Sequence, residues 1–476
     1  MGKKYDVIFV GAGMGSLVCA SYLARAGLNV LMVEHANQVG GYCTSFKRKG
    51  YTFDSSVHSL GCCRKGGLIG DVLQDLNLTN TIKIKRENPS DVVCFSPEER
   101  YSFYSTTDHT IEHLSGIFPL EKDNIREFIS FIEGAKYIDF FAKLNRITFA
   151  DMLNNYFRDE TLKNVLSSFL GNFHLPSTKA SAISAAMLFK EFVLDGGYYP
   201  QGGIQAFSDM FASCVKGHGG EILLSTKANK IYASKGKVEG VATDRGDFFS
   251  KVVISGADAI QTYTKLIESE FIPEKMLSTL RQLIPTTSSF VVYVCLNEDI
   301  STMFNCTSLW YFSNRNPNIN LEKLSNHHHE IKGALLMASP SNHSRAMAPE
   351  GKSSLQLLIG MPYAESAYWE EKKEFIADEI VSQAEDLIPG LSSMYADRYI
   401  ATPHTFQRYT LNYHGAFRGW QALPEQISPF LVPQKGVLEN LYLVGHWVTQ
   451  PGQGGVPTVV FSGKNLAKEI LEKVEF

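Results

Sequence analysis

Two short apolar runs near the start of the chain flank a segment of different composition. Val7 to Val10 and Val30 to Val33 are uninterrupted, which is typical of strands that are buried on both faces of a parallel sheet. The alanine-rich stretch between them predicts a helix, and Gly27 marks its end. The pattern therefore predicts a strand, a helix and a second strand that ends at Glu34.

Strands and helices alternate again in the middle and at the end of the chain. Residues 198–259 predict a helix opened by the sequence PQGG, then two short strands and a hairpin. Near the C-terminal end, ENLYLV predicts a buried strand, which leads through the glycine-rich joint of residues 445–467 into a helix predicted over KNLAKEILEKV. Alternating strands and helices predict an α/β fold.

Two other regions have a clear pattern. SSFVVYVCLNED, residues 288–299, predicts a strand, and residues 372–391 predict an amphipathic helix that ends at Pro389 and Gly390. Aromatic residues recur at near-helical spacing in a third region, at Phe131, Tyr137, Phe140, Phe141, Phe149, Tyr156, Phe157, Phe169 and Phe173. A helical core is the favoured interpretation for most of them, and an apolar tunnel or a membrane-facing surface is the alternative.

Composition excludes several classes of protein. The chain has 476 residues and a net charge of −4, so we expect two or three domains and no nucleic-acid surface. No apolar run reaches the roughly 18 residues of a membrane span, and the strand at Tyr5 leaves no room for a secretory signal. Eight irregularly spaced cysteines indicate reduced thiols and a cytoplasmic protein. We interpret His327 to His329 as a solvated loop and expect no metal site.

The first predicted turn has the spacing of a dinucleotide-binding loop. Gly11 would form the tight turn, Gly13 would let the backbone approach a pyrophosphate, and Gly15 lies at the helix start. Glu34 follows about 20 residues later and can accept hydrogen bonds from a ribose. Ser16 stands where a third glycine is usual, and serine is small enough to fit there.

A second pair of glycines, Gly40 and Gly41, follows Glu34 directly. A nicotinamide-binding domain needs no such pair, whereas a longer ligand that runs back along the protein does. The sequence through VGGYCTSFKRKGYTFDSSVHSLG resembles the phytoene desaturase superfamily of flavoproteins, nearest the branch of carotenoid isomerases and retinol saturases. The double glycine, the GYTFD stretch and His58 carry this resemblance.

The resemblance implies an α/β fold in which a Rossmann-type FAD domain, similar to glutathione reductase, carries an inserted α+β substrate domain. The implied division assigns residues 1–75, 196–265 and 435–476 to the FAD domain. It assigns residues 76–195 and 266–434 to the substrate domain. The resemblance is strongest at 5–61, 198–260 and 401–468 and weak in the substrate-domain segments.

FAD is the implied cofactor, and NAD(P)H or another external electron donor or acceptor stays open. The backbone near Ala228 would contact the adenine, in a region that ends at ISGAD, where Gly256 replaces the usual Asn. The glycine-rich joint near the C-terminus would be the second half of the flavin site, with His446 where an Asp is commoner. The residues implied to bind the cofactor are Gly11, Gly13, Gly15, Ser16, Glu34, Gly40, Gly41, Ala228, Gly445, His446, Gly454, Gly455, Val456 and Pro457.

The implied activity is oxidation, reduction or cis–trans isomerisation at the C–C and C=C bonds of an apolar, carotenoid- or retinoid-like polyene. His58 is the first candidate for handling a proton, because the resemblance places its segment beside the flavin. Further polar candidates near the ring are His404, Arg408, Tyr413 and His446. A structural hydrogen bond is the simpler interpretation of each one taken alone.

Two other functions stay open. An amine or porphyrinogen oxidase would keep the fold, although Tyr42 stands where those relatives commonly have Arg. A non-enzymatic carrier of prenyl lipids, similar to Rab escort and GDP-dissociation inhibitor proteins, would also share the architecture, but a carrier has no need of two phosphate-approaching loops. We expect an apolar small-molecule partner. The direction of reaction, peripheral contact with a membrane and the oligomeric state stay open.

Overall fold

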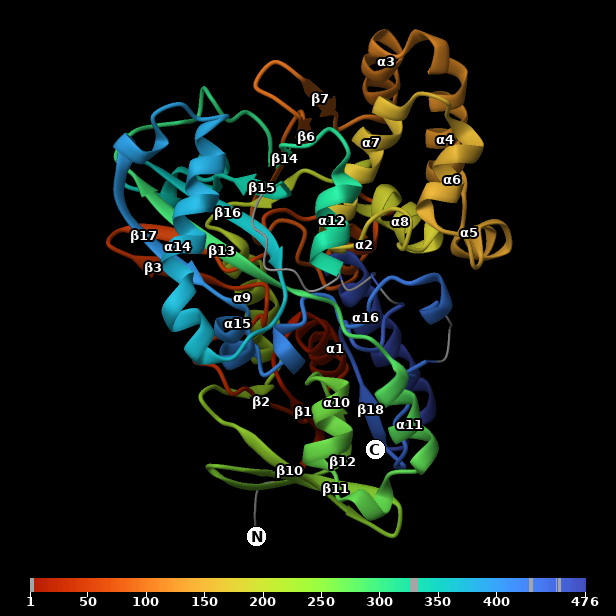
Figure 1. Cartoon of the computed structure of the whole chain (residues 1–476). Coiled ribbons are helices and arrows are strands. Elements are labelled where there is room, and N and C mark those ends of the chain that lie inside the picture. Colours follow the sequence, from red (N-terminus) through yellow and green to blue (C-terminus); the bar gives the residue numbers. More distant parts are fainter. Residues whose placement is uncertain (1–3, 326–332, 428–430, 451, 453–454) are drawn as a thin grey trace.

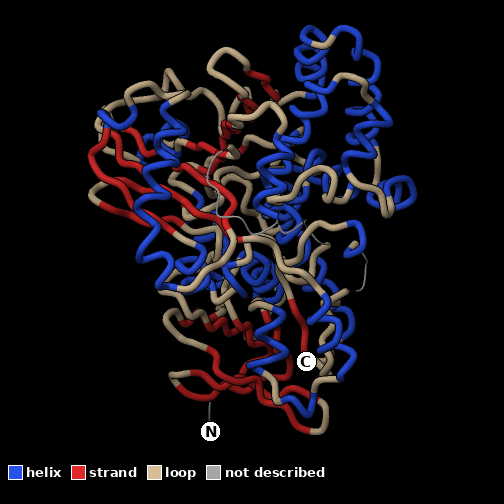
Figure 2. The backbone as a smooth tube through the Cα atoms, viewed as in Figure 1, coloured by secondary structure: helices blue, strands red, loops and turns tan. Residues whose placement is uncertain are grey.

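The computed structural model describes residues 4–325, 333–427, 431–450, 452 and 455–476. Two sheets form its two halves, one in the lower part of Figure 1 and one in the upper left. A group of helices, α3 to α8, extends at the upper right. Figure 2 shows the same division, with most of the strands in two separate groups and helices around both.

The first sheet takes its strands from three separate parts of the chain. In the described residues it has seven strands, ordered β10-β11-β12-β1-β2-β9, with β18 paired to β12. Strands β1, β2, β9, β12 and β18 run parallel, and β10 and β11 form an antiparallel extension. Their bounds are β1 (Lys4–Val10), β2 (Val30–Val33), β9 (Glu221–Leu223), β10 (Ala228–Ser234), β11 (Lys237–Thr243), β12 (Gly246–Ser255) and β18 (Leu441–Leu443).

Helices cover both faces of this sheet, because its strands are apolar on both sides. Val7 and Phe9 of β1 face a core shared with α1 (Met14–Arg25), α9 (Ile204–Gly217) and α16 (Val456–Lys473). Ile8 and Val10 face the opposite core, which includes Tyr263 and residues of α11 (Glu274–Gln282). Successive side chains of β1 therefore point into two different hydrophobic cores, as the uninterrupted apolar run predicts.

The second sheet also has seven strands in the described residues, ordered β17-β13-β16-β15-β14-β6-β7. One face packs on α14 (Ser366–Glu385), where Phe290 lies beside Trp369. The other face, with Tyr293, belongs to the core of the helical region. Its bounds are β6 (Asp91–Cys94), β7 (Arg100–Phe103), β13 (Ser288–Leu296), β14 (Ser308–Tyr311), β15 (Leu335–Ala338), β16 (Ser353–Met361) and β17 (Tyr395–Ala401).

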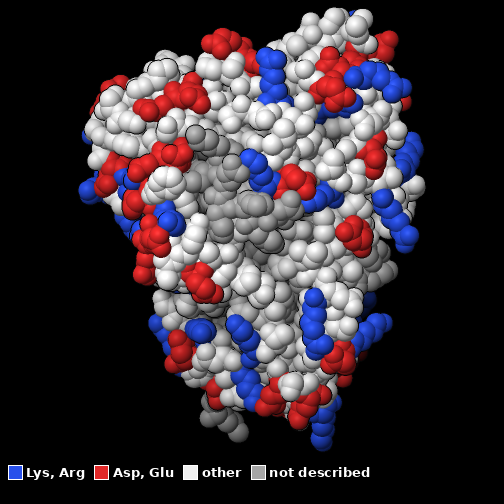
Figure 3. Space-filling view, in the orientation of Figure 1, with Lys and Arg blue, Asp and Glu red and all other residues white. Residues whose placement is uncertain are grey.

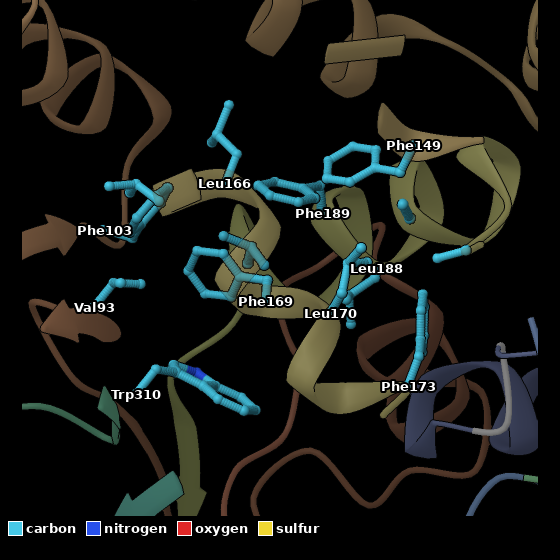
Figure 4. Close-up of a cluster of buried hydrophobic side chains, with 14 of the residues drawn as sticks. Val93, Phe103, Phe149, Leu166, Phe169, Leu170, Phe173, Leu188, Phe189 and Trp310 are labelled. Carbon is cyan, nitrogen blue, oxygen red and sulfur yellow. The ribbon is translucent and has the colours of Figure 1, made fainter. Parts of the chain in front are cut away.

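The helical region consists of α3 (Thr107–Ile117), α4 (Lys122–Gly134), α5 (Tyr137–Leu144), α6 (Phe149–Tyr156), α7 (Glu160–Ser168) and α8 (Ala182–Leu188). A π-helical turn, Phe189–Val193, continues α8. Figure 4 shows the buried side chains between these helices and the second sheet, where Phe169, Phe189 and Phe149 lie close together. All nine aromatic residues singled out in residues 128–173 belong to this core or pack against it. The helical-core interpretation is confirmed for them.

Shorter elements complete the described chain. Two small antiparallel sheets pair β3 with β4 and β5 with β8. Their bounds, and those of the remaining α-helices, are β3 (Ser45–Arg48), β4 (Tyr51–Asp54), β5 (Ile84–Arg86), β8 (Tyr198–Pro200), α2 (Leu68–Asp75), α10 (Ala259–Gln261), α12 (Pro317–Ser325), α13 (Pro340–His343) and α15 (Pro403–Thr410).

The expected fold class is confirmed: an α/β domain of Rossmann type with a second domain inserted. The division at residues 75, 195, 265 and 434 stays a prediction. One element differs from expectation, because α16 begins at Val456 and includes most of the joint that the sequence suggested was irregular. Pro457 stands in the first turn of that helix, where its missing N–H costs nothing.

Two surface properties bear on partners. Within the described ranges, no helix is both long enough and apolar enough to cross a membrane. On the face shown in Figure 3, acidic and basic side chains are interspersed. The run His327 to His329 lies outside the described residues. Elsewhere in the described chain, no three His, Cys, Asp or Glu side chains come together as a metal-ion cluster.

Candidate active site

The loop between β1 and α1 forms one wall of a large cavity. Gly11 has a φ of +90°, and its N–H donates to the carbonyl of Val33 at 2.8 Å. Gly13 is the N-cap of α1, and a Cβ built on it would meet no atom within 4 Å. The backbone at Gly13 is therefore open to the cavity, beside the free N–H groups of a helix start.

Glu34 lies in the same wall, with each carboxylate oxygen bonded to backbone. Oε2 accepts from Ala12 N at 2.7 Å, and Oε1 accepts from Ala36 N at 2.8 Å. Burial raises the pKa of this carboxyl above its ordinary value, and the two hydrogen bonds oppose the rise. The two bonds fix the carboxylate in the cavity wall and leave lone pairs that can accept from a hydroxyl.

The hydroxyl of Ser16 is buried. The residue is 1% exposed, lines the cavity, and its Oγ has no hydrogen-bond partner within the described part of the chain. A buried hydroxyl without a partner is costly unless something binds to it. Ser16 is the third residue of α1, and its Oγ lies against Gly256, where a built Cβ would be 2.0 Å away.

The second glycine pair, Gly40 and Gly41, lines the cavity beside the first loop. Gly40 bridges to Gly13, and its N–H donates to the carbonyl of Ala12 at 2.8 Å. Gly40 and Gly41 have φ values of +119° and +63°, which only glycine adopts readily. A Cβ on Gly40 would lie 2.3 Å from a backbone oxygen, that of Cys43. The pair thus carries the chain in a tight turn beside the first loop.

The two ends of the chain meet at this cavity. A Cβ built on Gly15 would lie 3.1 Å from the Cα of Gly445, so the two glycine segments are in direct contact. Gly445 has a φ of +105° and is open on its other side. Gly455 is the N-cap of α16, and Val456 and Pro457 begin that helix. Gly454 lies outside the described residues.

Ala228 lines the far end of the cavity, at the start of β10. All the described residues predicted to bind the cofactor therefore line one continuous cavity, whose volume is about 1420 Å³. An open backbone at Gly13 and Gly445 and a fixed carboxylate at Glu34 together fit a dinucleotide with a sugar and a pyrophosphate.

His58 faces the interior of the same cavity. Phe192 and Trp310 stand edge-on to its ring, at centroid distances of 5.8 and 6.4 Å. Burial, followed by the charge of Arg418, lowers the pKa of His58 to about 3. Nε2 has no partner among the described residues. At neutral pH this side chain is an uncharged imidazole that lines the cavity and has one buried nitrogen without a partner among the described residues.

His446 also lies at the cavity, directly after Gly445. Its Nε2 is 3.3 Å from Asn412 Oδ1, which also accepts from Trp447 Nε1 at 2.7 Å. Burial and then Arg418 lower the pKa of His446 to about 4. Because an amide oxygen only accepts, Nε2 carries the proton and Nδ1 is left as an acceptor. An uncharged acceptor thus stands where Asp is commoner in similar proteins.

Of the three other candidates, His404 and Arg408 lie on α15, and Tyr413 lies in the turn that follows it. His404 is half-buried and Arg408 is exposed, with its guanidinium 4.8 Å from the ring centroid of Tyr409. Both line the outer part of the cavity. Tyr413 is 39% exposed and does not line it. The charge of Arg418 therefore acts on both His58 and His446 and contributes to their lowered pKa values, whereas Arg408 lies at the surface.

Sequence reasoning missed the group that dominates the electrostatics. Arg418 is partly buried, lines the cavity and donates from Nη2 to Asn172 Oδ1 at 2.9 Å. Its charge also acts on His174, whose pKa falls to about 4, mainly through burial. Arg418 stands inside a stretch noted for its resemblance, but nothing in the local pattern separates a buried arginine from an exposed one.

Glu191 was also missed. It lies on the π-helical turn after α8, and its side chain lines the cavity. Burial raises the pKa of its carboxyl to about 8, so the group is protonated at neutral pH. Single π-turns within helices are frequent at functional sites. The apolar part of the cavity wall beyond it includes Phe46, Phe192, Tyr293, Trp310, Leu336, Leu358, Phe406 and Phe417.

None of the nine aromatic residues of 128–173 lines this cavity. The tunnel interpretation is therefore wrong for them, because they fill the core between the helices. The aromatic walls come instead from β3, β13, β14, the π-turn and the segment 406–417.

Comparison with known proteins places this geometry in context. The family model described as flavin containing amine oxidoreductase matches residues 17–471. Prolycopene isomerase 2 from an Oncidium hybrid cultivar is 27% identical, over 100% of this chain and 85% of its own length. A lycopene-forming phytoene desaturase from Pantoea ananas is 25% identical, over 97% and 98%. All-trans-retinol 13,14-reductase from Danio rerio is 23% identical, over 96% and 84%.

Solved structures share the fold at lower identity. An oxidoreductase from Methanosarcina mazei has a TM-score of 0.71 at 17% identity and covers 98% of this chain and 100% of its own. A Rab GDI from Plasmodium falciparum has a TM-score of 0.56 at 12% identity, with full coverage of both chains. The same architecture thus occurs in an oxidoreductase and in a Rab GDI, so the fold alone does not decide the function.

Proposed function

Because this chain belongs to the family of flavin-containing amine oxidoreductases, we propose that it binds FAD and acts on the C–C or C=C bonds of an apolar polyene. The bond would be desaturated, saturated or isomerised. A reaction with net oxidation or reduction also needs an external two-electron partner, such as NAD(P)H, oxygen or a quinone. The relatives named for prolycopene, phytoene and retinol support this substrate class.

The observation that carries the proposal is a single cavity with two kinds of wall. Glycine backbone, Ser16 and Glu34 line one part, and these groups suit the phosphates and sugar of FAD. Aromatic and aliphatic side chains such as Trp310 and Leu358 line the other, which suits a hydrocarbon. A substrate in the second part would adjoin the cofactor in the first.

The chain supplies orientation and a dry environment. A bound flavin would supply hydride transfer at its N5 atom. His58 is the proposed proton-handling residue, since its ring lines the cavity beside Phe192 and Trp310 and is uncharged at neutral pH. His446 would accept a hydrogen bond from a cofactor hydroxyl through Nδ1. His404 and Arg408 stay candidates for polar contacts at the outer part of the cavity.

The electrostatics disfavour an amine oxidase. Burial lowers the pKa of Arg418 to about 10, so the guanidinium remains a cation at neutral pH. A protonated amine entering the same cavity would meet a like charge in a medium of low polarity. A neutral hydrocarbon has no such penalty. Arg418 therefore favours the polyene substrate over the amine.

The non-enzymatic carrier is the second alternative. Gly13 and Gly445 keep an open backbone that a lipid carrier has no use for. Retention of a phosphate-binding cradle at both ends of the chain favours a flavoprotein.

The test is the visible absorption spectrum of the purified protein, followed by chromatography of the ligand released on denaturation. We expect a flavin spectrum and free FAD in the supernatant. The loaded protein is then incubated with cis and trans polyenes under oxidising and reducing conditions, and the products are separated by chromatography. A colourless protein that cannot be loaded with FAD would refute the proposal, and a retained prenyl lipid would then support the carrier.

A further inference from the structure

Three cations line the outer part of the cavity, and each comes from a different element. Arg48 is the last residue of β3, Lys373 lies on α14 and Arg408 lies on α15. The two arginines are exposed and the lysine is half-buried. All three elements lie on the same side of the molecule, at the left of Figure 1. We call these three residues the basic rim.

Two of these elements also carry apolar side chains of the cavity wall. Phe46 of β3 lines the cavity, and the guanidinium carbon of Arg48 lies 5.4 Å from the centroid of its ring. Phe406 of α15 is buried and lines the cavity two residues before Arg408, with its ring centroid 5.1 Å from that of Phe417. On both elements the wall therefore changes from an aromatic ring to a cation within two residues.

The protein supplies no counterion for the basic rim. In the part of the chain that the structure describes, none of its three cations forms an ion pair with a carboxylate. The acids of neighbouring segments are bound to other cations. Asp397 of β17 pairs with Lys49 at 2.7 Å, and Glu374 of α14 pairs with Arg398 at 2.9 Å.

The carboxyl groups of the cavity wall do not pair with the basic rim either. Among the described residues, four such groups line the cavity. Glu34 and Asp258 accept from backbone N–H groups, and Asp209 accepts from Gln205 Nε2 at 2.9 Å. Glu191 is protonated at neutral pH, because burial raises its pKa to about 8. In a chain of net charge −4, the unpaired positive charge of the rim is therefore a local feature.

We propose that the substrate of this cavity is an anionic amphiphile, a polyene chain that ends in a carboxylate or a phosphate ester, and that the basic rim holds its head group. The inference rests on the proposed function and narrows its substrate class. A pure hydrocarbon leaves the rim without a partner, whereas an anion accepts charge-assisted hydrogen bonds from guanidinium and ammonium groups. The held head group fixes how far the chain enters, and so which bond lies beside the cofactor.

Three ligands with one polyene chain and different head groups test this. Retinol, retinoic acid and retinyl phosphate are titrated into the FAD-loaded protein, and binding is followed by quenching of tryptophan fluorescence. We expect each anion to bind about tenfold more tightly than the alcohol at low salt. This advantage should shrink when the salt is raised from about 50 mM to about 500 mM, because salt screens exposed charges. The tighter of the two anions identifies the head group.

A double variant, Lys373→Gln with Arg408→Gln, removes two charges of the rim. It should lose most of the advantage of the anions and keep the affinity for retinol, whereas a merely structural role would weaken all three ligands. For an anion that is converted, KM should rise with little change in kcat, because the rim lies away from the reacting bond. The matched control is Lys216→Gln with Arg126→Gln, two exposed positions outside the cavity, and it should bind like the wild type.

The outcomes separate the two proposals. A protein that binds no flavin refutes the proposed function and this inference with it. A loaded protein that binds the alcohol and both anions equally, or whose rim variant keeps the advantage of the anions, refutes the inference alone. If the double variant does not fold, Arg48→Gln decides the matter. Cosedimentation with phosphatidylglycerol vesicles that depends on the rim, without discrimination between head groups, would assign the rim to a lipid surface and also refute the inference.

Discussion

The hydroxyl of Ser16 occupies the space beside Gly256. A Cβ built on Gly256 would lie 2.0 Å from Ser16 Oγ, and 3.4 Å from Ser16 Cβ. The N–H of Gly256 donates to the carbonyl of Val10 at 2.8 Å, which fixes its backbone against β1. The sequence shows two separate departures from the expected motifs, serine for glycine at 16 and glycine for asparagine at 256. In space they are one complementary pair.

Coupling between these positions is therefore the first prediction. Gly256→Ala should destabilise the protein by about 1–3 kcal/mol, since overpacking forces a shift in a closely packed region. Adding Ser16→Ala removes the clashing oxygen and leaves only an ordinary contact, so the double variant should regain at least about 1 kcal/mol. Urea unfolding of the four proteins in the flavin-free state measures this coupling. Additive effects of the two changes would contradict it.

Contact between α1 and α16 is the second point that can be tested. A Cβ on Gly463 would lie 2.5 Å from the carbonyl oxygen of Gly15 and 3.1 Å from Cys19 N. These are backbone atoms of a helix, which cannot move away separately. Gly463→Ala should therefore destabilise the protein by about 1–3 kcal/mol and weaken FAD retention, because it pushes the start of α16 from the cavity.

Gly134→Ala is the matched control for this substitution. Gly134 ends α4, far along the chain from the cavity, and a Cβ there meets no atom within 4 Å. Alanine restricts the unfolded chain at such a site, so the variant should be neutral or more stable by up to about 1 kcal/mol. Equal FAD loss in Gly134→Ala and Gly463→Ala would contradict the helix-contact explanation.

Asp54, the aspartate of the GYTFD motif, holds together chain segments that pack beside the cavity. Asp54 is fully buried and accepts from Ser45 Oγ, Tyr199 OH and Ile204 N, at 2.6, 2.5 and 2.9 Å. Ile204 begins α9, so Asp54 links the β3–β4 hairpin to a helix that is distant in sequence. Asp54→Ala would leave three buried donors unpaired and should cost about 3–5 kcal/mol. Asp54→Asn keeps an acceptor and should cost less. Equal losses in the two variants, measured by urea unfolding, would contradict this role.

Much of the cofactor end follows from the sequence because its signals are local. The turn at Gly11, the helix start at Gly13 and the acid at Glu34 are fixed by neighbours within one strand–helix–strand unit. Glycines with positive φ and an apolar run of fixed length allow few alternatives. Gly445 and Gly455 are recognisable for the same reason, although the contact between Gly15 and Gly445 joins opposite ends of the chain.

The substrate end could not be predicted in the same way. Arg418, Asn172 and His174 come together from segments that are up to 246 residues apart, and each stands in an ordinary local context. The nine aromatics of 128–173 have the spacing of a helix, which cannot show whether its apolar face meets a cavity or a core. Long-range packing decides this, and the side chains that line the cavity come from other strands and loops.

Glu191 should give the stability a distinctive pH dependence. Burial raises the pKa of its carboxyl from 4.5 to about 8, so between those values the folded protein holds a proton that the unfolded chain releases. The free energy of unfolding contributed by this group therefore falls as the pH rises from about 4.5 to about 8. Glu191→Gln removes the contribution, and the variant should gain on the wild type by about 1.4 kcal/mol for each pH unit across this window.

Flavin-free protein unfolded in urea at pH 4.5, 6 and 8 is the measurement that checks this, since the difference between variant and wild type cancels the other buried groups. Other buried groups also titrate in this range. The pKa values of Asp54, Asp91 and Asp258 are raised and those of the three buried histidines are lowered, so the two sets change the stability with pH in opposite directions. Glu112→Gln, at an exposed position on α3, removes one surface carboxyl and is the control that should not reproduce the pH-dependent gain of Glu191→Gln. If the difference between Glu191→Gln and the wild type does not change with pH, the carboxyl of Glu191 is ionised in the folded protein at neutral pH.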